Sequence, residues 1–408
     1  MKILLINKFL FPKGGSETVL FDTAALLAAR GHRLSFMAME HPRNVVPAWP
    51  TVLVSQVLLE GKPSPAEAFK AAGRVLFSFE ARRRLEKFIR DEKPDLAHLH
   101  NIHHQISPSI LPVLKDHGIP VVMTLHDLKM ACPVYTCVSH GRICESCRGR
   151  RFYFCLAKSC NQNSYAKSAL SALEMFIHHV LLRIYRHVDY FIAPSEFLKL
   201  KLEDMGFRAP MVCLPHFLDT ADFTPSFEAE EPSFIYFGRL ARVKGIQTLI
   251  KAARGLPLKG KIVGDGELKE DVMRAVQAPG YSGLILKPHL SRGELIAEVR
   301  TSSCAVLPSE WYENCPLSVI EAFALGKPVI GARIGGIPEL VRDGETGLLF
   351  EPGNARDLGE KLMTLAGNPG LAAEMGKRAR RGVEERLNPD VYYSKLMEIY
   401  GKAQQRCS

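Results

Sequence analysis

Two series of short apolar segments alternate with helix-forming segments along this chain, and this pattern constrains the fold more than any other feature. The first series runs from residues 3–6 to 190–193, and the second runs from 234–237 to 328–330. Strands that alternate with helices form parallel sheets whose faces are covered by those helices. The sequence therefore predicts an α/β protein with two doubly wound, Rossmann-like domains.

The boundary between the two predicted domains lies in a stretch rich in proline and acidic residues at 215–232. We expect an N-terminal domain at 1–215, with a cysteine-rich insertion at 132–160, and a second domain at 216–387. Residues 388–408 have a helical pattern. A chain of 408 residues is too long for one ordinary hydrophobic core, which agrees with this division.

The formal net charge is +10, and the excess of basic residues lies entirely in residues 1–215. A basic amphipathic helix is expected at 81–90, either as a solvated face or as a contact with an anionic membrane surface. Nucleic acid is a poorer partner, because aromatic residues do not interleave with the basic ones. No apolar run is long enough to span a membrane, and the N-terminal segment is a strand rather than a signal peptide, so a cytoplasmic location is expected.

Two glutamates, Glu313 and Glu321, stand eight positions apart after a predicted strand at 304–308. Asn314 and Pro316 are typical of a helix cap and a first-turn proline. In such a helix, Asn314 and Glu321 would lie about 10 Å apart along the axis. The N–H groups at a helix start suit phosphate, and the carboxylates suit sugar and ribose hydroxyl groups.

The sequence after Glu321 continues with Gly335-Gly336-Ile-Pro-Glu339. In this part the chain resembles the family-4 retaining glycosyltransferases, whose hallmark is a Glu-x7-Glu element followed by a Gly-Gly-x-Pro-Glu turn. The resemblance implies the GT-B fold, with two Rossmann-like domains that face a central cleft. It also implies that the first domain binds the acceptor, that the second binds the nucleotide-sugar, and that the last helix crosses back to the first domain.

The same resemblance assigns the donor residues. Arg239 and Lys244 match the family's Gly-Arg-x4-Lys-Gly motif, in which both cations clamp the donor diphosphate, and Gly264 lies in a turn beside the nucleotide. This turn lacks the third glycine of a dinucleotide fingerprint. The expected donor-binding set is Gly15, Arg239, Lys244, Gly264, Asn314, Cys315, Pro316, Leu317 and Glu321.

On the acceptor side, Gly14 and Gly15 resemble the family's first-domain glycine loop, with Ser16 expected to cap the next helix. The resemblance makes His126 the histidine that contacts the transferred sugar, whereas a buried structural histidine is the alternative. The expected acceptor-side set is Gly14, His103, His104 and Asp127. The expected catalytic set is His126, Arg239, Lys244 and Glu313, with no metal in catalysis because the cations and the helix start replace it.

Six of the ten cysteines fall between Cys132 and Cys160. In a cytosolic protein, a structural zinc ion is the first interpretation of such a cluster, with reduced thiols, redox chemistry or an iron–sulfur centre as alternatives. The expected ligands are Cys144, Cys147, Cys155 and Cys160, and Cys137 or His140 could replace one of them. Several bacterial members of the family carry a similar insertion after a His-Asp motif.

These features predict a retaining, metal-independent hexosyltransferase that moves a sugar from a UDP- or GDP-sugar to a glycan or lipid-linked acceptor. Cell-surface polysaccharide or glycolipid synthesis is the expected context, with possible peripheral contact to the inner face of the cytoplasmic membrane. A nucleotide-sugar epimerase of the same architecture and a zinc-stapled nucleic-acid-binding protein are the alternatives.

Overall fold

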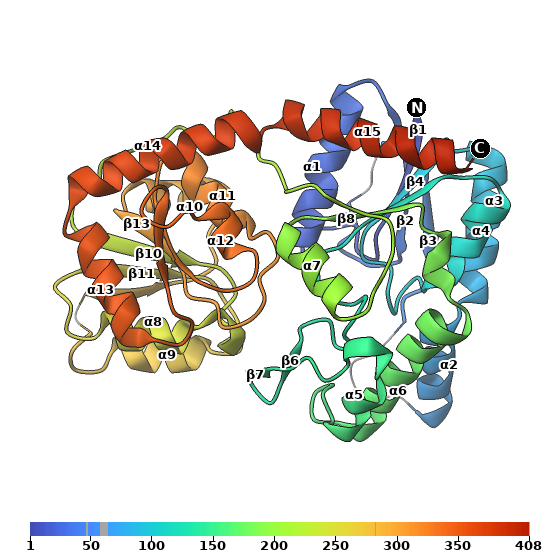
Figure 1. Cartoon of the computed structure of the whole chain (residues 1–408), viewed down its shortest axis with the longest axis horizontal. Coiled ribbons are helices and arrows are strands. Elements are labelled where there is room, and N and C mark those ends of the chain that lie inside the picture. The colour runs from blue at the N-terminus through green and yellow to red at the C-terminus, as the bar shows by residue number, and fades with distance from the viewer. Residues whose placement is uncertain (46–47, 58–63, 282, 408) are drawn as a thin grey trace. The chain divides into compact units, whose positions relative to one another are not determined.

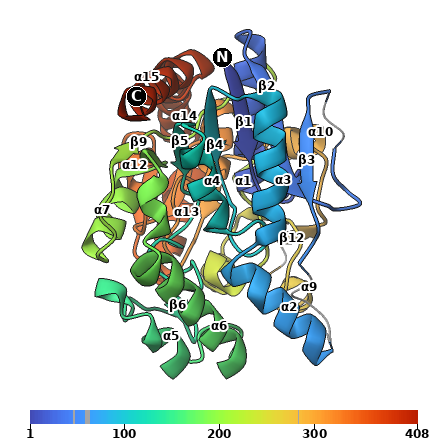
Figure 2. The same ribbon diagram turned by 90° about the vertical axis from the view of Figure 1, so that its right-hand side faces the viewer.

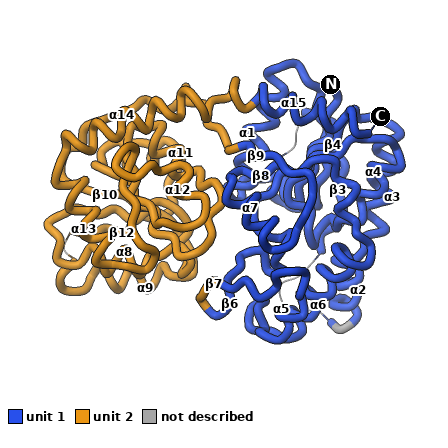
Figure 3. The backbone as a smooth tube through the Cα atoms, in the orientation of Figure 1, with its two compact units in different colours: residues 1–140, 144–214, 393–408 blue, residues 141–143, 215–392 orange. Residues whose placement is uncertain are grey.

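The computed structural model describes residues 1–45, 48–57, 64–281 and 283–407. The chain divides into two compact units (Figure 3). Unit 1 contains Met1–His140, Cys144–Leu214 and Tyr393–Ser408, and unit 2 contains Gly141–Ile143 and Pro215–Tyr392. Each unit contains one large parallel sheet, as the alternating pattern predicts (Figure 1). Among the described residues, no helix is long and apolar enough to cross a membrane.

The sheet of unit 1 has seven parallel strands in the order β3-β2-β1-β4-β5-β8-β9. Their bounds are β1 Lys2–Ile6, β2 Arg33–Met39, β3 Thr51–Val54, β4 Leu96–Leu99, β5 Val121–Thr124, β8 Tyr190–Ala193 and β9 Met211–Cys213. Leu5 of β1 pairs with Phe36 of β2 on one side and with His98 of β4 on the other. The order of strands reverses between β1 and β4, where doubly wound sheets bind ligands at the carboxyl ends of their strands.

Helices cover the sheet of unit 1, and a small hairpin and shorter turns complete it. The α-helices are α1 Gly15–Ala29, α2 Pro65–Leu76, α3 Phe79–Glu92, α4 Leu111–Asp116, α5 Tyr153–Ala157, α6 Tyr165–Phe176 and α7 Glu196–Asp204. The hairpin is β6 Val138–Ser139 with β7 Arg142–Ile143. Single turns of 3-10 helix occur at Pro108–Ile110, Arg148–Arg150 and Ile184–His187, and a π-helical turn, Ile177–Leu181, directly follows α6.

Helix α3 is the basic amphipathic helix that the sequence predicts. The Ser78 side chain caps it by accepting a hydrogen bond from the Ala81 N–H. Ala81, Leu85 and Ile89 are buried along one face, at the spacing of one residue in four. The helix ends where Lys93 adopts a left-handed conformation.

The sheet of unit 2 has six parallel strands in the order β12-β11-β10-β13-β14-β15. Their bounds are β10 Ser233–Phe237, β11 Lys259–Val263, β12 Leu284–Lys287, β13 Cys304–Leu307, β14 Val329–Ala332 and β15 Gly347–Phe350. The helices are α8 Ile246–Ala253, α9 Lys269–Val276, α10 Arg292–Arg300, α11 Leu317–Ala324, α12 Ile337–Leu340, α13 Ala355–Ala366 and α14 Pro369–Arg386, with a 3-10 turn at Arg242–Lys244. Here the strand order reverses between β10 and β13.

The last helix, α15 Pro389–Cys407, begins in unit 2 and joins unit 1 from Tyr393 onward. Three side chains attach it to unit 1. The Tyr400 hydroxyl lies 2.7 Å from His98 Nδ1, the Tyr393 hydroxyl lies 2.9 Å from His32 Nε2, and Arg406 donates to the Asp189 carbonyl. The prediction that the terminal helix contacts the first domain is confirmed.

Candidate functional site

In unit 2, the expected donor residues gather in loops at the carboxyl ends of neighbouring strands. Lys244 follows β10, and its Nζ lies 2.6 Å from Glu313 Oε1 in the loop after β13. The same carboxylate accepts hydrogen bonds from Ser309 and, at 2.8 Å, from the Trp311 indole N–H. Lys244 also lies 5.2 Å from the centre of the Trp311 ring. One carboxylate, one cation and one aromatic ring therefore form a connected group.

Glu313 is buried, with 6% of its surface exposed. Burial by itself would raise the pKa of this carboxyl group, but Lys244 and the two hydrogen-bond donors hold its pKa below the ordinary value. Glu313 is therefore ionised at neutral pH. An ionised carboxylate only accepts hydrogen bonds, so it is suited to the hydroxyl groups of a sugar.

Two glycines hold this group in place. Gly245 has a φ of +69°, and a Cβ atom there would lie 1.7 Å from the Pro308 carbonyl oxygen. Gly335 has a φ of +63°, and its Cβ would lie 2.3 Å from the Glu313 carbonyl oxygen, which also accepts the Gly336 N–H at 2.8 Å. Only glycine combines this backbone conformation with such close approach. The Gly-Gly turn thus positions the Glu313 loop.

The expected helix start at Asn314 is wrong. Helix α11 begins at Leu317, and Pro316 is its N-cap, with an extended backbone and no side chain that caps the helix. The reason is steric, because a residue that precedes proline avoids the helical region, so Cys315 cannot begin the helix. Asn314 consequently lies in the loop, and the axial distance expected from Asn314 to Glu321 does not apply. No side chain caps α11, so the N–H groups of its first turn make no hydrogen bond to a capping side chain.

The other expected donor residues also occupy the carboxyl edge of this sheet. Arg239 follows β10 with an exposed side chain, and its carbonyl accepts a 2.8 Å hydrogen bond from the buried Tyr236 hydroxyl. Gly264 follows β11, and Glu321 is half-buried in α11. Cys315 is buried in the core of unit 2. Gly15, the remaining expected donor residue, belongs to unit 1.

In unit 1, the glycine loop differs from the prediction in one detail. Gly14 is the N-cap of α1 and Gly15 is its first residue, so Ser16 lies inside the helix and does not cap it. No side chain caps this helix either. The buried Glu17 accepts a 3.2 Å hydrogen bond from Asn7, and the Asn7 side chain also binds the Asn101 N–H. These contacts connect the start of α1 to the loops after β1 and β4.

His126 follows β5 and belongs to a row of three histidines. His126 Nε2 lies 2.9 Å from His100 Nδ1, and these two rings stack with centroids 5.2 Å apart. His100 stacks in turn on His98, at 4.6 Å. His98 bonds to Thr124 and to Tyr400, and burial lowers its pKa to about 3. The neutral His98 therefore connects the terminal helix, through His100, to His126.

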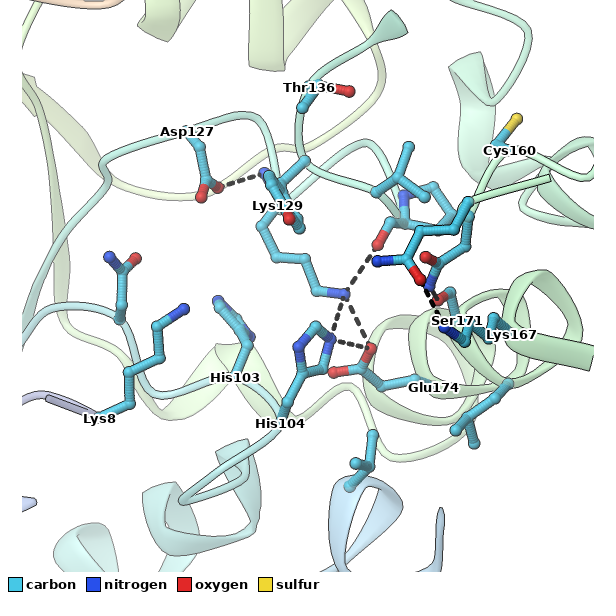
Figure 4. A pocket seen from close by; sticks show the side chains of 18 residues that line it. Lys8, His103, His104, Asp127, Lys129, Thr136, Cys160, Lys167, Ser171 and Glu174 are labelled. Atoms are coloured by element: carbon cyan, nitrogen blue, oxygen red, sulfur yellow. Dashed lines mark hydrogen bonds and ion pairs between the residues drawn. The ribbon is translucent and has the colours of Figure 1, made fainter. Parts of the chain in front are cut away.

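A cavity of about 510 Å³ opens at the carboxyl ends of β1, β4 and β5 (Figure 4). We call it the polar cavity. It is lined by three of the four expected acceptor-side residues, His103, His104 and Asp127, whereas Gly14 is not part of the lining. Its opposite wall comes from the cysteine-rich insertion, from the two residues after it and from α6. That wall consists of Pro133, Val134, Tyr135, Thr136, Cys160, Asn161, Gln162, Lys167, Leu170, Ser171 and Glu174.

A buried ion pair joins the two walls of the polar cavity (Figure 4). Lys129 Nζ lies 2.8 Å from Glu174 Oε2, which also lies 3.1 Å from His104 Nε2. Burial would raise the pKa of Glu174, but Lys129 and His104 hold it well below its ordinary value. His104 has a φ of +67°, an uncommon conformation for a side-chain-bearing residue. The ion pair fixes this strained histidine at the cavity wall.

The sequence analysis missed four charged residues of the polar cavity: Lys8, Lys129, Lys167 and Glu174. Lys8 stands two positions after β1, and Lys129 stands two positions after the predicted Asp127. Their places after parallel strands were the available signal. Glu174 carried no such signal, because it lies on a helix far along the chain and reaches the cavity only through the packing of α6.

The four expected zinc ligands occupy the insertion, but they do not form a metal site. Cys147 and Cys155 are buried together with Phe152 and Met175, and Cys160 packs against this cluster. Lys158 donates to the Cys144 thiol, at 3.4 Å. Among the described residues, no group of three or more histidine, cysteine or acidic side chains is arranged to hold a metal ion. The prediction of structural zinc therefore has no support from this geometry.

Comparison with known proteins agrees with the two-sheet architecture. The protein is similar to sucrose-phosphate synthase from Thermosynechococcus elongatus, with a TM-score of 0.73, 19% identity and 98% of each chain covered. It is also similar to Anabaena Alr3699/HepE, solved in complex with UDP-glucose, with a TM-score of 0.66, 16% identity and coverage of 98% of this chain and 99% of that one. At this level of identity the likeness establishes the fold, which is GT-B.

Among curated proteins, the chain is 33% identical over 146 residues to the uncharacterized glycosyltransferase MJ1178 of Methanocaldococcus jannaschii. The matched segment covers 36% of this chain and 41% of the relative. The chain is also 32% identical over 186 residues to the sulfoquinovosyl transferase SQD2 of Arabidopsis thaliana. This matched segment covers 41% of the chain and 35% of the relative. The chain thus matches less than half the length of these relatives.

The fold and the arrangement of charged loops define a glycosyltransferase-like protein. The model of Glycosyltransferase Family 4 matches residues 13–222, and the model of Glycosyl transferases group 1 matches residues 219–382. The chain belongs to glycosyltransferase family 4. The finer assignment to a subgroup with a cysteine-rich insertion rests on the sequence alone.

Proposed function

We propose that this protein is a retaining glycosyltransferase that moves a hexose from a nucleotide-sugar to an acceptor. One observation carries the proposal: Lys244, Glu313 and the uncapped start of α11 lie together at the carboxyl edge of the β10–β13 region. Lys244 and Arg239 would bind the diphosphate, Glu313 the hexose and Glu321 the ribose. The family membership favours this activity over an epimerase or a nucleic-acid-binding protein.

The chemistry follows from where charge develops. Negative charge grows on the leaving diphosphate as the glycosidic bond breaks, and fixed cations and helix N–H groups stabilise that charge. A leaving phosphate oxygen can accept the proton of the acceptor hydroxyl, so retention requires no covalent carboxylate. These protein groups supply the positive charge on the donor side, and we expect turnover without an added metal ion. His126 would contact the transferred sugar from unit 1.

Thermal unfolding in the presence of nucleotide-sugars tests the proposed donor site. We call the set of UDP-, GDP- and ADP-sugars used in this experiment the donor panel. A ligand that binds only the native state raises the unfolding midpoint. One nucleotide class should stabilise the wild type but not the Arg239→Ala or Glu321→Ala proteins. UDP-glucose is the first donor to test, because Anabaena HepE was solved with it. No stabilisation by any donor at millimolar concentration would contradict the donor site.

We propose that unit 1 makes peripheral contact with an anionic membrane at the cytoplasmic face. Helices α2 and α5 both pack against α6, and the two views place all three at the same end of unit 1 (Figures 1 and 2). Large apolar side chains are exposed on each of them, including Phe69 at 83%, Tyr165 at 67% and Phe176 at 50%. Exposed Lys70 and Lys167 supply positive charge beside them.

Vesicle flotation tests this contact. Binding to phosphatidylglycerol vesicles should fall when Phe69, Tyr165 and Phe176 are changed to serine. Binding to neutral phosphatidylcholine vesicles should be weak in both proteins, and high salt should weaken the interaction with anionic vesicles. A wild-type protein that does not float with anionic vesicles at low salt would favour a soluble acceptor. A lipid-linked acceptor in polysaccharide or glycolipid synthesis is the context that we propose.

A further inference from the structure

A second cavity in unit 1, of about 390 Å³, shares Lys8, His103 and His104 with the polar cavity. Its other walls come from the loop after β1, from the end of β2 and from the segments after β2, β3 and β4. These lining residues are Phe9, Phe11, Lys13, Met39, His41, Arg43, Gln56, Val57 and Gln105. The described lining contains three basic residues, Lys8, Lys13 and Arg43, and no carboxylate. We call it the cationic cavity.

Aromatic rings, rather than carboxylates, hold these cations. Lys13 Nζ lies 3.9 Å from the centre of the Phe9 ring, and Lys8 Nζ lies 5.4 Å from the same ring centre. Arg43 Cζ lies 4.3 Å from the centre of the Phe11 ring. Within the described residues, none of the three cations forms an ion pair. A cation on a ring face keeps its N–H groups available, so these groups can bind an anion.

Lys8 lines both cavities, and its side chain is partly exposed between them. Its ammonium makes no hydrogen bond to any other described residue, and burial lowers its pKa despite the nearby Asp127 carboxylate. A cation that is partly removed from water and makes no hydrogen bond to a neighbouring group is costly. An anionic ligand group at this junction would remove that cost, because it returns both a countercharge and hydrogen-bond acceptors.

The polar cavity next to this junction suits a different chemical group. Side-chain amide and hydroxyl groups line it, including those of Asn101, Thr136, Asn161 and Ser171. Such groups both donate to and accept from sugar or polyol hydroxyls. The two connected cavities therefore match a ligand with hydroxyl groups at one end and negative charge at the other.

We propose that the acceptor of this enzyme is anionic, with a phosphate or carboxylate group in the cationic cavity and its hydroxyl-bearing part in the polar cavity. The proposal rests on the proposed function, since only a transferase requires an acceptor. A phosphate of this kind can belong to a free sugar phosphate or to a lipid-linked phosphate. Both present the same oxyanion to Lys8, Lys13 and Arg43.

The test uses calorimetry on the full chain with Arg239→Ala and Lys244→Ala, so that the cations of unit 2 do not contribute to anion binding. The probes are inorganic phosphate, glucose 6-phosphate, glucuronate and neutral glucose. We expect at least one anion to bind about tenfold more tightly than glucose. Adding Lys13→Gln and Arg43→Gln should weaken that binding by about tenfold or more. Both side chains are exposed, so these changes should leave the fold intact.

The matched control carries Arg83→Gln and Lys87→Gln, two exposed cations of α3 that line neither cavity. It should bind the anions like its parent. A parallel experiment uses phosphatidylcholine vesicles with and without a polyprenyl phosphate. Selective loss in the Lys13/Arg43 variant with soluble anions identifies a free acceptor, and selective loss only with polyprenyl phosphate vesicles identifies a lipid-linked one.

Two results would overturn the proposal. One is that no anion and no polyprenyl phosphate vesicle binds more tightly than its neutral counterpart. The other is that the Lys13/Arg43 variant and the Arg83/Lys87 control lose binding equally, since this would reflect net charge rather than a site. Neither result depends on nucleotide-sugar binding, so a failure here is distinct from a failure of the donor panel.

Discussion

The cations beside the candidate donor site of unit 2 and those of the cationic cavity of unit 1 are held in different ways. In unit 2, Lys244 is neutralised by Glu313 at 2.6 Å, and this carboxylate has two further hydrogen-bond donors. In unit 1, Lys13 and Arg43 rest on aromatic rings without a carboxylate partner among the described residues. A paired cation is fixed in position before its ligand arrives, whereas an unpaired one relies on the ligand for its countercharge. We infer that geometry dominates donor recognition and that net charge dominates acceptor recognition.

The largest effect should come from the ion pair behind the polar cavity, where unit 1, like unit 2, pairs a lysine with a buried carboxylate. Lys129→Met leaves Glu174, which is fully buried, without its cation. We expect unit 1 to lose about 3–5 kcal/mol of stability. Chemical denaturation followed by hydrogen exchange in α6 measures this loss. Replacing both partners, with Lys129→Met and Glu174→Leu, should recover much of it, because no uncompensated charge is then buried.

If the double variant were as unstable as Lys129→Met alone, the cost would come from packing rather than from the charge. His104 still faces the position of Glu174, so its conformation provides a second readout. The chemical shift of the His104 ring should change in both variants. That change distinguishes loss of the ion pair from a general loosening of the unit.

The second effect should fall on catalysis rather than on stability. Lys244→Ala removes the fixed cation beside the proposed diphosphate site, and we expect kcat to fall by about 10²–10³, or roughly 3–4 kcal/mol in the transition state. Lys244→Arg should retain part of the activity because the charge remains. Lys251→Ala, at an exposed position of α8, is the matched control. An equal fall in the Lys251 variant would contradict a specific role for Lys244.

The candidate site of unit 2 could be proposed from the sequence because its residues are local to short motifs. Arg239, Lys244, Glu313 and the glycine turn each follow a strand within a few residues, so a short motif determines their positions. The start of α11 was misplaced because a cap-like asparagine was weighed above the restriction that Pro316 imposes on its neighbour. The strands β3, β9 and β15, which lie at edges of the two sheets, were not predicted.

In unit 1, the central strands and the histidines after them could be predicted, but the cavity walls could not. Glu174 approaches Lys129 across 45 residues of sequence, and Tyr400 approaches His98 across 302. Such contacts depend on how helices pack on a sheet, and no spacing rule describes them. A site made of motif residues is visible in one sequence, whereas a site made by packing is not.

The third effect is a pH dependence that should be largest in unit 1, to which the buried His216 of unit 2 also contributes, because burial lowers its pKa to about 4. Burial lowers the pKa values of His98 and His179 to about 3, and both are neutral in the folded protein at neutral pH. In the unfolded chain they titrate near 6.5, so the unfolded state binds more protons below that pH. Stability should therefore be fully present above pH 6.5 and fall as the pH drops from there toward 3, by up to about 1.4 kcal/mol per pH unit for each histidine.

Thermal unfolding of the wild type and of His98→Gln across this range measures the effect. The glutamine variant should be less stable at neutral pH, because its fit to Thr124 and Tyr400 is poorer. Its midpoint should nevertheless fall less steeply below pH 6.5. Parallel curves for the two proteins would show that His98 does not contribute to the acid sensitivity of unit 1.

The smallest effect should come from removing the hydroxyl group of one buried tyrosine in each unit. Tyr400 and Tyr236 are both 1% exposed, and each hydroxyl makes a short hydrogen bond, to His98 at 2.7 Å and to the Arg239 carbonyl at 2.8 Å. Each change to phenylalanine should cost about 1 kcal/mol of stability.

The functional consequences of the two changes should differ. Tyr236→Phe loosens the Arg239 loop and should raise the donor KM a few-fold, whereas Tyr400→Phe should alter kcat through the histidine row that ends at His126. If both variants changed only the donor KM, the histidine row would have no part in positioning His126. The two tyrosines would then affect catalysis only through donor binding, and the expected difference between the two units would be absent.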